Sequence, residues 1–136
     1  RSAMRAARAY QNVDRHTAVI SGNTVDLVIL LYEKLLQRFR EARKAIELND
    51  ISARGEATSK AIELIEKGLI GCLDMRQGGA IAEQLRHQYS LWLNQVLRCN
   101  LTADLGLLEK VEAEVKDILS AWQEIKKQPP AINRLS

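Results

Sequence analysis

The segment LLEKVEAEVKDILSAWQEIKK, residues 107–127, decides the fold. Its apolar residues recur at intervals of three and four, the spacing that brings side chains to one face of an α-helix. Polar and charged residues fill the positions between them. We therefore expect an amphipathic helix with one buried face, whose seam consists of Leu108, Val111, Val115, Ile118, Trp122 and Ile125.

Three stretches upstream have the same period, and short polar breaks separate them at residues 49–50, 74–79 and 100–103. Short connections make successive helices antiparallel. The sequence thus predicts an all-α protein, an antiparallel up-down-up-down four-helix bundle with an N-terminal arm. We expect the arm at residues 1–23, the bundle at 24–127 and a flexible tail at 128–136, after two prolines that cannot continue a helix. Residues 1–3, before Met4, resemble an expression scar.

Polar residues at the breaks are candidate helix caps: Asn23 for the first helix, Asp50 for the second and Thr102 for the fourth. Gly78 and Gly79 allow a tight reversal before the third helix. Gly68 and Gly71 lie inside the apolar stripe of the second helix. We interpret them as points where a neighbouring helix comes close or the helix bends, although simple tolerance is the alternative.

Composition excludes several functions. The 20 basic and 17 acidic residues give a mixed surface rather than a strongly basic one. Arginines near the N-terminus could contact nucleic acid, but a solvated arm is the simpler interpretation, and aromatic residues are only 4% of the chain, too few for base stacking. The longest apolar run, residues 27–32, is too short to cross a bilayer. We expect a cytoplasmic protein with no stable membrane insertion, and we interpret Cys72 and Cys99 as buried thiols.

No residue pattern indicates catalysis, a metal site or a cofactor. His16 and His87 do not follow a glutamate at the spacing that bundle metal sites use. His87 falls on the outer side of the third helix, without the small residue and lysine that phosphotransfer domains place after their histidine. We expect no enzyme activity, and a histidine phosphotransfer bundle stays a minor alternative.

The helices hold more apolar residues than a seam requires, since a bundle helix needs about three in seven. Such residues either widen the core or form grooves that suit an amphipathic partner segment. We take them as candidates for partner binding, together with arm residues. The candidates are Tyr10, Ile20, Ile29, Leu30, Leu36, Leu64, Ile70, Leu93, Leu97 and Leu107.

Over nearly its whole length the chain resembles the flagellin-specific export chaperone family of bacterial flagellar secretion. The resemblance lies in the order and spacing of several segments. Two departures are Asn23-Thr24-Val25, where the family has Ser-Pro-Glu, and Glu33-Lys34, where it has Asp-Gly. The matching segments are Ala9-Tyr10, Leu31-Tyr32, Asn49-Asp50-Ile51, LDMRQGGAIAEQL at residues 73–85, Asn100, Asp104 and Ala121-Trp122.

The resemblance implies a cytoplasmic chaperone that binds the disordered C-terminal segment of flagellin, prevents its premature polymerisation and presents it to components of the flagellar export gate. It also implies that the arm covers a groove when no client is bound, with Tyr10, Val19 and Ile20 as the contacts. A helical adaptor for another secreted subunit is the alternative. The sequence leaves open whether two empty chains pair weakly.

Overall fold

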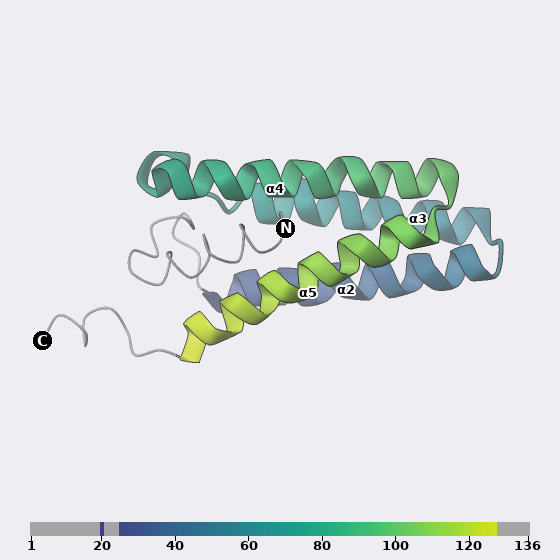
Figure 1. Cartoon of the computed structure of the whole chain (residues 1–136), viewed down its shortest axis with the longest axis horizontal. Helices are drawn as coiled ribbons and strands as arrows, with labels where there is room; N and C mark the ends of the chain where they lie inside the picture. Colours follow the sequence, from purple (N-terminus) through teal and green to yellow (C-terminus); the bar gives the residue numbers. More distant parts are fainter. Residues whose placement is uncertain (1–19, 21–24, 128–136) are drawn as a thin grey trace, which may run out of the picture.

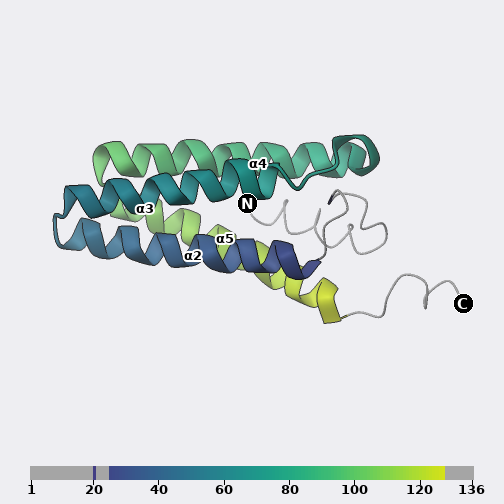
Figure 2. The same cartoon turned by 180° about the vertical axis from the view of Figure 1, so that it is seen from behind.

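The computed structural model describes Ile20 and residues 25–127. In this part of the chain the helices run antiparallel to their neighbours, and the last one returns to lie against the first (Figures 1 and 2). The predicted all-α four-helix bundle is therefore confirmed. Its elements are α2 (Val25–Glu47), α3 (Ile51–Glu63), which continues into the π-helix η1 (Leu64–Ile70), α4 (Met75–Thr102) and α5 (Leu105–Lys127).

The turn from α2 to α3 follows the sequence expectation. Asn49 has a positive φ of 56°, which ends α2. The Asp50 side chain then accepts a hydrogen bond of 3.0 Å from the backbone N–H of Ala53. Asp50 thus caps α3 as predicted, because it satisfies an amide that has no partner within the helix.

The cap of α5 is Asp104, so the prediction of Thr102 was wrong. Asp104 accepts a hydrogen bond of 3.0 Å from the N–H of Leu107. Thr102 still belongs to α4, and its hydroxyl donates to the carbonyl oxygen of Arg98. Between them Ala103 has a φ of 53°, which ends α4. The predicted cap of the first helix, Asn23, lies outside the described residues.

The expected break at residues 74–79 is only partly a loop. Asp74 accepts hydrogen bonds from the N–H groups of Arg76 and Gln77, and it thereby caps a first turn of α4. At Gly79 the backbone leaves the helical region, with φ 53° and ψ −130°. This conformation is open to glycine and strained for other residues. Gly79 therefore bends α4 away from its first turn.

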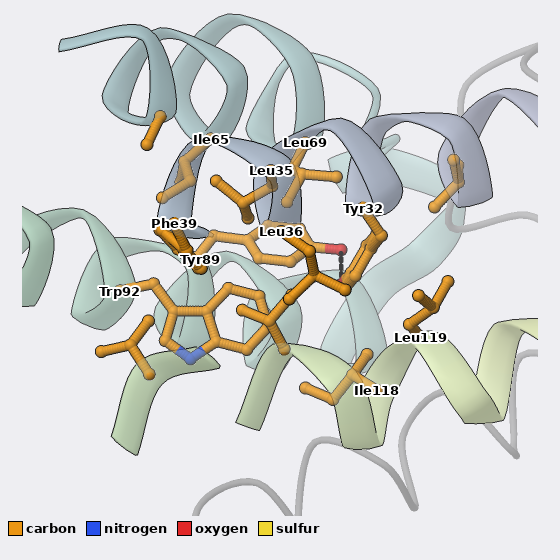
Figure 3. Close-up of a cluster of buried hydrophobic side chains, with 14 of the residues drawn as sticks. Tyr32, Leu35, Leu36, Phe39, Ile65, Leu69, Tyr89, Trp92, Ile118 and Leu119 are labelled. Carbon is orange, nitrogen blue, oxygen red and sulfur yellow. Dashed lines mark hydrogen bonds between the residues drawn. The ribbon is translucent and has the colours of Figure 1, made fainter. Parts of the chain in front are cut away.

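The core contains the seam of α5 and the matching faces of the other helices. All six seam residues between Leu108 and Ile125 are buried. Tyr32, Tyr89 and Trp92 form a cluster of edge-on and tilted rings with centroids 5.7–6.4 Å apart, as Figure 3 shows from one side. Burying a large apolar side chain contributes roughly 1.5–3 kcal/mol, so this interior is the main source of stability.

Two ion pairs join α2 to α5 and fit their antiparallel register. Arg43, near the end of α2, pairs with the buried Glu112 in the first half of α5. Lys126, near the end of α5, lies 2.7 Å from Asp26 at the start of α2. The second pair is exposed, and such pairs contribute little. Glu112 depends on its partners more strongly, because a buried carboxylate without a cation is costly.

Candidate partner-binding surface

Three of the ten candidate residues are buried rather than open to a partner. Ile29 and Leu36, expected at the flank or back of the first helix, belong to the core cluster. Leu36 lies in the same cluster as Ile118 and Leu119 of α5 (Figure 3). A helix with two neighbours buries more than one narrow stripe, which is why positions beside the seam become core. Ile20 is buried as well.

Leu30 and Leu97 lie on the surface, as a partner-binding role requires. The side chain of Leu30 on α2 is 45% exposed, and that of Leu97 on α4 is 43% exposed. Each has an exposed apolar neighbour on its own helix, three or four residues away, namely Leu27 and Leu101. Residues at this spacing share one helix face. Both helices therefore present short apolar rows to solvent.

A third group of candidates is half-buried. Leu64, Ile70, Leu93 and Leu107 pack against the core while keeping part of their surface open. Leu93 precedes Leu97 by four residues, so it extends the exposed row of α4 toward the core. Leu64 and Ile70 are the first and last residues of η1.

The exposed rows do not form one groove. α2 packs against α3 and α5, and α4 packs against η1, α3 and α5, whereas the α2 and α4 backbones make no close approach. The two helices thus lie diagonally across the bundle, and Leu30 and Leu97 point to different sides of it. A single segment that contacts both rows must pass around the bundle.

Of the two candidate residues in the N-terminal arm, the structure describes only Ile20. Tyr10 lies outside the described residues. Ile20 forms an isolated antiparallel β-bridge with Leu73, in the link between η1 and α4, and its side chain joins the core cluster. Residue 20 is therefore anchored on the bundle at the end where α4 begins.

Sequence reasoning missed a further exposed apolar pair. Leu48 and Ile51 flank the turn between α2 and α3, and both side chains are largely exposed. The period of the helices gave no signal for them, because each lies at a helix end where one face no longer has a neighbour. Leu101, 79% exposed, was missed for the same reason at the end of α4.

The described residues offer no arrangement for metal chemistry, since they contain no group of three or more His, Cys, Asp or Glu side chains that could hold an ion. His87 is exposed on α4, where the sequence placed it. Among residues 25–127 there is no helix with the length and apolarity needed to span a bilayer.

Both cysteines are free thiols in the interior, as expected. Burial raises the pKa of the Cys99 thiol to about 11, and the negative charge of Asp104 acts in the same direction. Burial also raises the pKa of Cys72. A neutral thiol is a poor nucleophile, so these groups are part of the packing.

Exposed apolar rows on two sides of a helical bundle are typical of proteins that bind other polypeptides on their surface. Comparison with known families gives the particular group: the model of the flagellar protein FliS family matches residues 6–129, and this chain belongs to that family. The family resemblance read from the sequence is confirmed.

Curated relatives align with most of this chain and over most of their own length. The flagellar secretion chaperone FliS of Salmonella typhimurium is 36% identical over 118 residues, 87% of each chain. That of Escherichia coli is 31% identical over 130 residues, 96% of each chain. The flagellar secretion chaperone FliSB of Pseudomonas aeruginosa is 33% identical over 123 residues, which cover 90% of this chain and 97% of the relative. The family is thus one of secretion chaperones and not of enzymes.

Proposed function

We propose that this chain is a cytoplasmic export chaperone that binds the C-terminal segment of flagellin, keeps it from polymerising too early and delivers it to the flagellar type III export apparatus. The observation that carries the proposal is the match to the FliS family over residues 6–129, together with relatives named flagellar secretion chaperones. The apolar surface supports it independently.

The placement of the exposed rows suits a long, flexible client. Leu30 with Leu27 and Leu97 with Leu101 offer apolar contacts on two sides of the bundle. Ordering a flexible segment costs about 2–5 kcal/mol or more of the gross interaction energy. Contacts spread over both sides offset this cost without requiring one deep pocket, and they leave the complex releasable.

In this proposal the N-terminal arm competes with the client for apolar surface of the bundle. Ile20 reaches the core cluster and bridges to Leu73 although it precedes the bundle in sequence. In this proposal the arm residues Tyr10, Val19 and Ile20 cover apolar surface until the client displaces them. Deleting residues 1–23 should then tighten client binding, because the competing contact is gone. An unchanged affinity would exclude the cap.

Isothermal titration of a purified flagellin C-terminal peptide against the full chain tests the central proposal. Saturable binding with a negative heat-capacity change is expected, since apolar surface becomes buried. A scrambled peptide of the same composition serves as the control. Absence of heat and of any thermal stabilisation by the authentic peptide, with the protein folded, would refute the function.

An adaptor for another secreted subunit is separated from this function by competition. Full-length flagellin, and not other flagellar subunits, should displace the labelled flagellin peptide. Delivery is tested apart from binding, by comparing the loaded and the empty chaperone for retention on immobilised export-gate components. Stronger retention of the loaded form is expected, and equal retention would argue against a role in delivery.

A further inference from the structure

A pocket of about 460 Å³ lies between α2 and the rod formed by α3 and η1. Neither the apolar rows nor the arm accounts for it. Four of its seven lining residues are cationic and one is acidic, so basic side chains predominate in the lining. The lining consists of Lys34, Arg38, Lys60, Glu63, Leu64, Lys67 and Gly68.

The four cations differ in whether an ion pair within residues 25–127 involves them. Arg38 lies 2.9 Å from Glu41, and Lys60 lies 3.1 Å from Glu56. Lys34 and Lys67, in contrast, take part in no ion pair within the described part of the chain. They project from different helices into the same pocket, so their positive charges are held together there and attract an anion.

The backbone of η1 shapes the pocket. A π-helix is rare and occurs frequently at functional sites. Gly68 lets Leu31 of α2 pack closely on this segment, because a Cβ built at Gly68 would come within 3.1 Å of Leu31 Cδ2. A side chain on Gly71, just after η1, would overlap the carbonyl oxygen of Lys67. Gly71 therefore permits the wide turn that follows Lys67, and Gly68 permits the close approach of α2 to the segment that carries Leu64 and Lys67.

We propose that this pocket binds an acidic peptide segment of a protein partner, with its carboxylates at Lys34 and Lys67 and an apolar side chain on Leu64. The volume matches that of a site for a few side chains. Nucleic acid is disfavoured because no lining residue is aromatic. The apolar Leu64 favours a peptide with both acidic and apolar side chains over a free phosphate, which has no apolar group to place there. The pocket is a docking site additional to the apolar rows, and its occupant is recognised by charge.

The probe for this site is a fluorescent peptide of alternating glutamate and leucine, titrated by anisotropy at about 50 mM salt, where charges are little screened. The control peptide carries lysine in place of glutamate. Lys34→Glu combined with Lys67→Glu should weaken binding by about tenfold or more, because like charges then face the peptide. Lys110→Glu combined with Lys44→Glu, the same charge change at exposed positions outside the pocket, should have less than about a twofold effect.

Several outcomes would overturn the site. The first is that the acidic peptide does not bind. The second is that the control lysine variant loses as much affinity as the pocket variant. The third is that inorganic phosphate, at matched ionic strength, displaces the peptide completely. Thermal unfolding of each variant reports folding, and exposed lysines should tolerate the change. The flagellin titration separates the two proposals: the Lys34→Glu and Lys67→Glu variant should still bind the flagellin peptide if the pocket serves a different partner.

Discussion

The hydroxyl of Tyr32 on α2 donates a hydrogen bond of 2.9 Å to the hydroxyl of Tyr89 on α4 (Figure 3). Both rings are buried, and their backbones lie on diagonal helices. The two side chains thus meet across the centre of the bundle and help to fix the relative position of two helices whose backbones do not come close.

Tyr32→Phe should lower the free energy of unfolding by about 1–3 kcal/mol, because the hydroxyl of Tyr89 loses its donor in the interior. The double variant with Tyr89→Phe should lose less than the sum of the two single changes, since the hydroxyls depend on each other. Urea unfolding of the four proteins measures this coupling. Additive losses would mean that the bond contributes nothing.

Trp122→Ala should cost about 3–5 kcal/mol, because a fully buried ring leaves a cavity. The matched change Gln123→Ala, at the exposed neighbour, should stay within about 0.5 kcal/mol. Chemical denaturation of both variants checks the difference. A similar small loss in both would show that the seam of α5 is not packed as described.

Two glycines should respond in opposite directions. Gly79→Ala should destabilise the fold by about 1–3 kcal/mol, because alanine is strained at the positive φ of this residue. Gly55→Ala should stabilise it by about 0.5–1 kcal/mol, since Gly55 lies within α3 and its added Cβ would meet only Asn100 Oδ1 at 3.8 Å. The melting temperatures of both variants test this prediction. Stabilisation by Gly79→Ala would contradict the bend of α4 at Gly79.

The buried thiols of Cys72 and Cys99 should be unreactive in the native state. At about pH 8, a thiol-reactive chromogenic reagent should label neither cysteine until denaturant is added, because the thiolate is disfavoured in the interior. The folded pKa of Cys99, about 11, exceeds its ordinary value of 9.0. The folded state therefore holds this proton more tightly, and the stability gained below pH 9 is lost as the pH rises through 11.

Comparison with Cys99→Ala separates the pH-dependent stability that Cys99 contributes from the titration of other groups. The stability difference between wild type and Cys99→Ala should shrink between pH 9 and 11. A difference that stays constant with pH, or rapid labelling of the native protein, would place Cys99 nearer to solvent than the structure does.

Leu30→Asp combined with Leu97→Asp should weaken binding of the flagellin peptide by about tenfold or more, equivalent to about 1.4 kcal/mol, with a cooperative unfolding transition retained. Leu97 is the better partner for Leu30 than the half-buried Leu93, whose change to aspartate would also disturb the core. Gln123→Asp controls for added charge. Unchanged affinity of the double variant would remove these rows from the binding surface.

The sequence predicted the fold well because its information is local and repeated. The period of α5 and the caps and breaks at residues such as Asp50 are properties of a few neighbouring positions. The partner surface was harder to predict, since burial of Ile29 and Leu36 depends on how far α5 covers α2. The basic pocket and η1 depend on the meeting of two helices, and no periodicity along one helix indicates that.

The diagonal placement of Leu30 and Leu97 also bears on how a client leaves. In the proposed complex, a tail held on both sides of the bundle would detach from one side while the other still tethers it, and its loose half would then rebind at a high effective concentration. Complete dissociation would then be slow without an applied force, although each contact is weak enough to be released singly. A machine that pulls from one end breaks the contacts in sequence, and each step requires only a fraction of the total binding energy.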